Sequence, residues 1–173
     1  MDIQIFGQNT LKIKTKKTTL ALDPEQGVQK FDADAIIAFG KNFDPQRINN
    51  YRVIINAAGE YEVSGLKVSG IFSEGETVFA LSSENVSALI AKASSLEKFS
   101  AEKLGDYKII ILNADSELKQ SIITAMEPSV VVIYGTKAKE GAKTLGEENV
   151  SASSKISLSE DKLPEEMAVM LLA

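Results

Sequence analysis

Apolar and polar residues alternate through the first part of the chain, which is the pattern of half-buried antiparallel strands. The alternating apolar positions are Ile3, Ile5, Leu11, Ile13, Leu20 and Leu22. We therefore expect an antiparallel meander of three strands. The third strand should end at Asp23-Pro24, because proline has no N–H group to donate to a sheet.

Further strands are expected where apolar runs recur between turn residues. Their ranges are 35–39, 52–56, 60–63, 66–71, 77–82 and 85–90. The connection between the first two contains Pro45 and has room for one short helical turn. Ser64-Gly65 and Ser83-Glu84 are the expected turns of two hairpins.

Beyond Lys92 the pattern changes to short helices that alternate with buried strands. The strongest helix is expected over residues 116–126, with Ser116 as its N-cap. Other helical turns are expected over residues 96–104 and 137–145, strands over 108–112, 130–134, 155–158 and 167–172, and a loop over 146–154. Strands followed by alternating strand and helix units predict an α/β fold, in a single domain that spans residues 1–173.

Composition narrows the class of protein. The chain has 173 residues, of which 44% are hydrophobic and 25% charged, as expected for one soluble globular domain. The formal net charge of -5 argues against nucleic acid and anionic membranes as partners, because both attract basic surfaces. The only basic cluster is Lys12, Lys14, Lys16 and Lys17, whose alternation indicates the solvated face of a strand. The chain shows no secretory leader and no apolar run of membrane length, so we expect a cytoplasmic protein.

The chain contains no histidine and no cysteine. This excludes a Ser-His-Asp triad, a thiol nucleophile and a zinc site built from imidazole or thiolate ligands. A glycine-rich phosphate loop is absent as well. Carboxylates near strand ends could bind Mg²⁺ or Ca²⁺ or could cap turns, and capping is the preferred interpretation. These carboxylates belong to Asp23, Asp34, Asp44, Glu60 and Asp115.

Several segments resemble the metallo-β-lactamase-fold superfamily, in particular its branch of predicted zinc-dependent hydrolases related to the ascorbate-phosphate lactonase. The segments cover residues 6–13, 20–24, 33–39, 59–65 and 126–128. The most specific of them is Gly59-Glu60-Tyr61-Glu62-Val63. The resemblance implies an αββα sandwich of the metallo-β-lactamase type, in shortened form, with mostly antiparallel mixed sheets.

In that branch a histidine-rich loop after a buried strand holds a dinuclear zinc centre. Gly40, Asn42 and Pro45 stand where the branch has histidines in this loop. Gln8 replaces a further histidine after the first strand, and only Asp44 matches a metal-site position. One aspartate cannot hold two zinc ions. The resemblance therefore implies a retained fold around a vestigial, metal-free site without a cofactor.

Loss of the ligands beside a retained scaffold favours a pseudoenzyme that binds a protein partner or assembles with itself. Exposed strands in the N-terminal meander favour a homodimer. Two alternatives stay open. One is a hydrolase with a rebuilt Mg²⁺ or Mn²⁺ site made from Asp23, Asp44, Glu60 or Asp115. The other is a small-molecule binding module that uses Gln8 and Asn42 in the old cleft.

Asp44 is expected to have a structural role. Pro45 favours an extended backbone at Asp44 and suits the first position of a helical turn. We therefore expect the Asp44 carboxylate to cap the turn Pro45-Gln46-Arg47.

Overall fold

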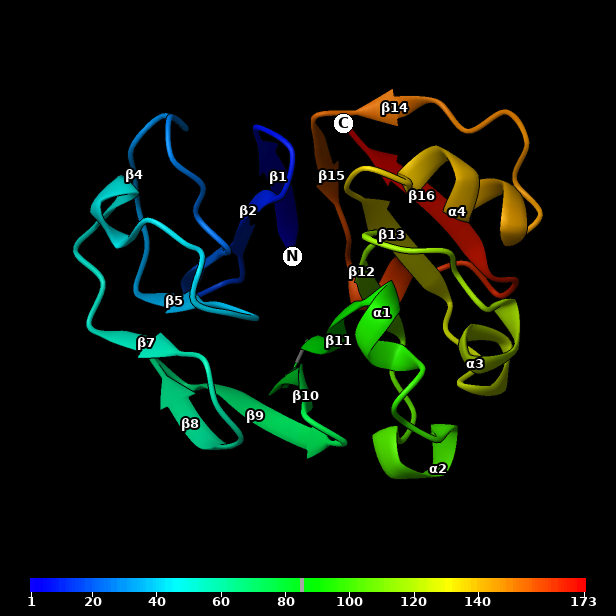
Figure 1. Cartoon of the computed structure of the whole chain (residues 1–173), viewed down its shortest axis with the longest axis horizontal. Helices are drawn as coiled ribbons and strands as arrows, with labels where there is room; N and C mark the ends of the chain where they lie inside the picture. Colours follow the sequence, from blue (N-terminus) through cyan, green and yellow to red (C-terminus); the bar gives the residue numbers. More distant parts are fainter. Residues whose placement is uncertain (85) are drawn as a thin grey trace.

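Two mixed β-sheets pack face to face in the computed structural model, which describes residues 1–84 and 86–173 (Figure 1). The first sheet has six strands. In spatial order they are β15 (Lys155–Ser157), β1 (Asp2–Phe6), β2 (Thr10–Lys14), β3 (Thr19–Leu22), β5 (Ala35–Ile37) and β7 (Val53–Ile55). Its first four strands are antiparallel, and β3, β5 and β7 are parallel to one another.

The second sheet has eight strands. Their order is β14 (Ala152–Ser153), β16 (Ala168–Leu172), β13 (Val130–Tyr134), β12 (Ile109–Asn113), β11 (Val86–Lys92), β10 (Glu76–Ser83), β9 (Leu66–Ser73) and β8 (Gly59–Val63). Strands β11, β12, β13 and β16 are parallel, whereas β8 to β11 form antiparallel hairpins.

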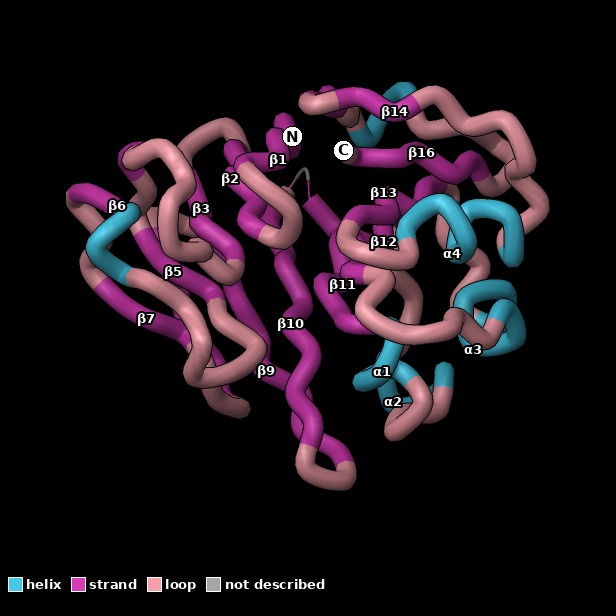
Figure 2. Tube along the Cα trace, turned by 45° about the horizontal axis from the view of Figure 1, so that its top comes forward, coloured by secondary structure: helices cyan, strands magenta, loops and turns pink. Residues whose placement is uncertain are grey.

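Short helices cover the outer face of the second sheet (Figure 2). They are α1 (Ala93–Leu96), α2 (Ala101–Leu104), α3 (Gln120–Ala125) and α4 (Ala138–Thr144). None of the helices in the described ranges is long and apolar enough to cross a membrane. A further 3₁₀ turn, η2, spans Glu160–Lys162.

The outer face of the first sheet has a thinner cover. It consists of the 3₁₀ turn η1 (Pro45–Arg47) and a small sheet of β4 (Phe31–Asp32) with β6 (Ile48–Asn49). Phe31 and Ile48 pack there against Ile36 of β5. The connection between β5 and β7 forms η1 and β6 rather than an α-helix, so this outer face has less helical cover than that of the second sheet.

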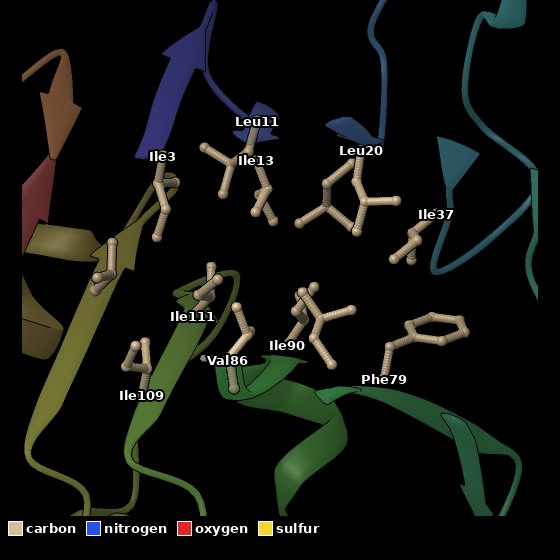
Figure 3. Close-up of a cluster of buried hydrophobic side chains, with 14 of the residues drawn as sticks. Ile3, Leu11, Ile13, Leu20, Ile37, Phe79, Val86, Ile90, Ile109 and Ile111 are labelled. Carbon is tan, nitrogen blue, oxygen red and sulfur yellow. The ribbon is translucent and has the colours of Figure 1, made fainter. Parts of the chain in front are cut away.

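The space between the two sheets is filled by aliphatic and aromatic side chains (Figure 3). From the first sheet come Ile3, Leu11, Ile13, Leu20 and Ile37, and from the second come Phe79, Val86, Ile90, Ile109 and Ile111. Complete burial of such a side chain contributes about 1.5–3 kcal/mol relative to leaving it in water. This apolar layer therefore holds the two sheets together.

Most of the elements expected from the sequence are confirmed. The antiparallel meander β1 to β3 and the hairpin β8–β9 form as predicted. The hairpin β10–β11 also forms, although Asn85, the expected first residue of its second strand, lies outside the described residues. The structure adds a long hairpin between β9 and β10 across Glu74-Gly75, which the alternation had not indicated.

Two expectations in the second half are wrong. The helix expected over residues 116–126 begins only at Gln120, and its N-cap is Lys119 rather than Ser116. The chain must first pass from the end of β12 to the outer layer, and Leu118 is buried from this non-helical segment. The loop expected over residues 146–154 contains the short strand β14, which pairs with the C-terminal strand β16.

The expected cap at Asp44 is confirmed. Asp44 is extended, with φ -111° and ψ 95°, and Pro45 takes the first position of η1. Its Oδ1 accepts a hydrogen bond of 3.0 Å from the Gln46 N–H, and its Oδ2 accepts one of 3.0 Å from Arg47 Nε. The Asp44 N–H donates to the Pro24 carbonyl at 2.6 Å, which ties this loop to the end of β3.

We expect Asp44→Ala to lower the free energy of unfolding by about 0.5–2 kcal/mol, the usual loss of an N-cap. Urea denaturation measures this difference. Asp44→Asn, which keeps an acceptor for the Gln46 N–H, should lose less. Asp106→Ala, at an exposed aspartate, is the matched control and should change little. An Asp44→Ala protein as stable as the wild type would contradict the capping role.

Candidate functional site

The carboxyl ends of parallel strands from both sheets meet at one end of the sandwich, which we call the site end. Residues at or just beyond these strand ends are Asp23 and Phe39 in the first sheet, and Lys92, Asn113 and Tyr134 in the second. Loops at the carboxyl ends of parallel strands are the usual place for ligand sites in α/β folds. The loop of residues 40–45 begins at this end.

Glu25 organises the turn between β1 and β2. Its Oε2 accepts hydrogen bonds from the N–H groups of Gln8 at 3.2 Å and Asn9 at 3.1 Å, and its Oε1 accepts one from Asn9 Nδ2 at 2.7 Å. The Gln8 residue is exposed. Reasoning from the sequence did not single out Glu25, because its partners lie 16 and 17 residues away in the chain.

Polar and aromatic contacts join the two sheets at the site end. Asn113 Nδ2 donates to Asn9 Oδ1 at 3.4 Å, which links β12 to the β1–β2 turn. Lys92 Nζ lies 5.5 Å from the centroid of the Phe39 ring, within the range of a cation–π contact. These contacts link the two sheets at the site end through side chains that are not usual zinc ligands.

Asp23 holds the start of the loop that follows β5. Its Oδ1 accepts a hydrogen bond of 3.0 Å from the Phe39 N–H, and its backbone has a positive φ of 42°. Burial raises the pKa of Asp23, while the Phe39 N–H and the charge of Lys92 oppose that rise. The Asp23 carboxylate therefore positions the backbone at Phe39 and is itself partly shielded from water.

Among the described residues, the five residues of the predicted vestigial site do not form one hydrogen-bonded group. Gly40 and Asn42 are exposed, while Asp44 and Pro45 are half-buried at η1. In the part of the chain that the structure describes, no hydrogen bond joins Gln8 to the other four. The hydrogen bonds of these five residues therefore do not indicate a common catalytic or binding role.

The carboxylates considered for a rebuilt metal site also have other partners. Asp115 accepts from the Ser94 N–H at 3.0 Å and from Ser94 Oγ at 2.6 Å. Glu60 lies on β8 and accepts from Ser69 Oγ at 2.7 Å. Across residues 1–84 and 86–173, no group of three or more histidine, cysteine or acidic residues is placed to hold a metal ion. The side chains present do not fit the dinuclear zinc centre that the resemblance implies.

Two buried oxygens at the site end have no hydrogen-bond partner among the described residues, namely Asn113 Oδ1 and the Tyr134 hydroxyl. The two residues are neighbours across β12 and β13 and are only 3% and 0% exposed. Burial raises the pKa of Tyr134 well above its ordinary value and Asp23 raises it further, whereas the neighbouring Asn113 side chain lowers it. Gly135 must be glycine here, because a Cβ would lie 2.4 Å from Asn113 Oδ1. Since these residues end apolar runs, the sequence pattern indicated only core.

A cavity of about 540 Å³ lies at the opposite end of the sandwich. It is bounded by the β2–β3, β8–β9 and β10–β11 turns, with Lys16, Lys17, Ser64 and Glu84 among its lining residues. None of the predicted site residues lines it.

Solved structures with the same architecture are found among metallo-β-lactamase proteins. A protein from Thermotoga maritima, classed as a zinc-dependent hydrolase of the metallo-β-lactamase superfamily, has a TM-score of 0.77 at 17% identity, over 99% of this chain and 98% of that one. The isothiocyanate hydrolase from Delia radicum gut bacteria has a TM-score of 0.61 at 11% identity, over 92% and 100%. The metallo-β-lactamase-fold protein YhfI from Bacillus subtilis has a TM-score of 0.59 at 5% identity, over 98% and 95%.

No protein-family model matches the sequence. No curated protein matches it either. The structural likeness therefore decides the architecture, and it covers nearly the whole chain at low identity. The chain has the metallo-β-lactamase fold, and it carries none of the histidines that the resemblance places in the metal site.

Proposed function

We propose that this chain is a non-catalytic protein of the metallo-β-lactamase fold, a pseudoenzyme that acts by binding a protein partner or by assembly. The observation that carries the proposal is the state of Asp44. This residue alone retains a ligand-type side chain in the motif, and both its carboxylate oxygens bind the turn that follows it. A carboxylate committed to an N-cap and to Arg47 is a structural group.

The other carboxylates support the same proposal. Asp23 binds the Phe39 N–H, Glu25 binds the Gln8-Asn9 turn, and Asp115 binds Ser94. Each of them stabilises local backbone near the site end. The hydrolase alternative would require several of these groups to leave their partners together. A cytoplasmic location and the absence of nucleic-acid or membrane partners remain predictions from the net charge of -5 and the sequence pattern.

A second candidate function is small-molecule binding at the site end. The unpartnered Asn113 Oδ1 and Tyr134 hydroxyl favour it, since buried polar groups normally have a hydrogen-bond partner. A small polar ligand or an ordered water molecule would supply that partner. This candidate requires no metal ion.

Protein purified without chelator should contain no stoichiometric zinc, because neither imidazole nor thiolate ligands exist in the chain. Elemental analysis tests this. Addition of a chelator should leave the melting temperature unchanged, since no bound metal contributes to the folded state. One zinc per chain, or a chelator-induced fall of several degrees, would contradict the proposal.

The wild-type protein should show no Mg²⁺- or Mn²⁺-dependent hydrolysis of phosphodiester, lactone or thioester substrates above buffer. Initial-rate assays with and without each metal measure this. The Asp44→Ala protein serves as the comparison, because Asp44 is the one retained motif residue. A metal-dependent rate in the wild type that disappears in Asp44→Ala would show an active hydrolase.

Tyr134→Phe tests whether the buried Tyr134 hydroxyl has a hydrogen-bond partner, as the second candidate function requires. If the Tyr134 hydroxyl has no partner, its removal should raise the free energy of unfolding by about 1–3 kcal/mol, the cost of an unsatisfied buried polar group. Urea denaturation measures this change. Tyr51→Phe, at a half-buried tyrosine, is the matched control and should change little. Destabilisation by Tyr134→Phe alone would show that the hydroxyl has a hydrogen-bond partner in the folded protein, either an ordered water molecule, Asn113 or a small ligand.

A further inference from the structure

The open edges of the two sheets differ from those that the sequence suggested. β1 pairs on both sides, with β2 and with β15, so the N-terminal meander offers no free edge there. The strands at the sheet edges are β15, β7, β14 and β8. β8 is the longest of them, with five residues, whereas the others have two or three. A long open edge strand is a template for pairing with another chain.

The register of β8 shows which backbone groups face outward. Val63 pairs with Leu66 across the two-residue turn Ser64-Gly65, whose positive φ angles of 50° and 83° are typical of a type I′ turn. The closing pair of such a hairpin exchanges hydrogen bonds, and the hydrogen-bonded pairs then alternate along the strand.

The N–H and C=O groups of Gly59, Tyr61 and Val63 therefore face β9, and those of Glu60 and Glu62 face away from the sheet. In the described residues, no other strand pairs with that outer side (Figure 1).

The side chains of β8 are apolar or aromatic on the face toward the core and acidic on the face toward solvent. Tyr61 and Val63 pack with the core between the sheets. Glu60 and Glu62 project on the opposite face, and both residues are exposed. Ser69 Oγ donates to Glu60 Oε2 at 2.7 Å, which holds one carboxylate beside the edge. The edge is thus open, and its two outward-facing residues are acidic, with Lys67 of β9 as the cross-strand neighbour of Glu62.

A second copy of the chain fits this edge poorly. Antiparallel pairing of two β8 strands, with the glutamates on one face, places Glu60 opposite Glu62 or a glutamate opposite its own equivalent. Like charges directly opposite each other in a sheet are destabilising. Opposite charges at the same positions are stabilising, so the edge suits a strand with basic residues two positions apart.

We propose that β8 is a strand-addition site for an extended peptide segment with lysine or arginine at alternate positions, which pairs antiparallel with its outer edge. The peptide's backbone bonds to Glu60 and Glu62, and its basic side chains lie opposite the two carboxylates. This inference rests on the proposed binding role and names the partner for it.

The test titrates the intact protein into a fluorescein-labelled peptide of alternating lysine and valine and follows fluorescence anisotropy. Two N-methylated versions have equal charge. In the predicted pairing the lysine N–H groups face β8 and the valine N–H groups face away. Methylation on lysine should therefore abolish binding, and methylation on valine should preserve it. Equal binding of the two would show non-specific attraction to an acidic protein and overturn the proposal.

Two double variants of the protein test whether the charges of Glu60 and Glu62 contribute to peptide binding. Glu60→Gln with Glu62→Gln should weaken peptide binding by about three- to tenfold, as two lost cross-strand charge pairs. Glu147→Gln with Glu148→Gln removes the same charge from an exposed loop elsewhere and should leave the affinity unchanged. Equal losses in both double variants would overturn the site.

Amide hydrogen exchange reports directly whether the peptide pairs with the backbone of β8. The Glu60 and Glu62 amides should exchange rapidly in the free protein and become protected when the peptide binds. Protection that grows with protein concentration alone would instead show self-pairing and overturn the choice of partner. Metal-dependent hydrolysis by the wild-type protein would overturn the proposed function without affecting these results. Failure of the peptide to bind β8 would overturn the strand-addition site, and the proposed function would then require another partner surface.

Discussion

Burial of apolar side chains between the two sheets is the interaction on which the rest of this structure depends (Figure 3). Leu20 of the first sheet and Phe79 of the second belong to the same buried cluster, and both are fully buried. Packing at this density fixes the distance and orientation of the sheets. The strand ends, and hence every loop at the site end, take their positions from that layer.

At the site end, ordinary hydrogen bonds hold the loops in which the resemblance places metal ligands. Glu25 holds the Gln8-Asn9 turn, Asn9 reaches Asn113 on the other sheet, and Asp44 caps η1. A carboxylate that accepts hydrogen bonds from backbone N–H groups stabilises a loop without an ion. These loops can thus be held without a metal ion, which is the physical basis of the proposed pseudoenzyme.

The sandwich has two candidate binding surfaces at different places, the site end and the β8 edge. The site end joins both sheets through polar contacts, and it contains the buried pair Asn113 and Tyr134. The edge at β8 belongs to the second sheet alone and presents backbone and acidic side chains to solvent. Binding at this edge requires no cleft, because main-chain hydrogen bonds supply most of the contacts in strand addition.

The sequence by itself determined the local elements and the types of metal ligand that the chain can offer. Alternation predicted β1 to β3, Pro45 predicted the short turn that Asp44 caps, and the lack of histidine and cysteine excluded the usual zinc ligands. These features depend on neighbouring residues or on composition alone, so one chain read in order is enough to find them.

Tertiary structure decided what depends on residues far apart in the chain. Only the packed sheets bring Asn9 to Asn113, 104 residues apart, and only the path from β12 to the outer layer delays α3 until Gln120. Pairing of β15 with β1 closes the expected meander edge in the first sheet, and β8 forms an open edge of the second sheet. Strand order is set by long-range burial and pairing, which hydrophobic periodicity does not encode.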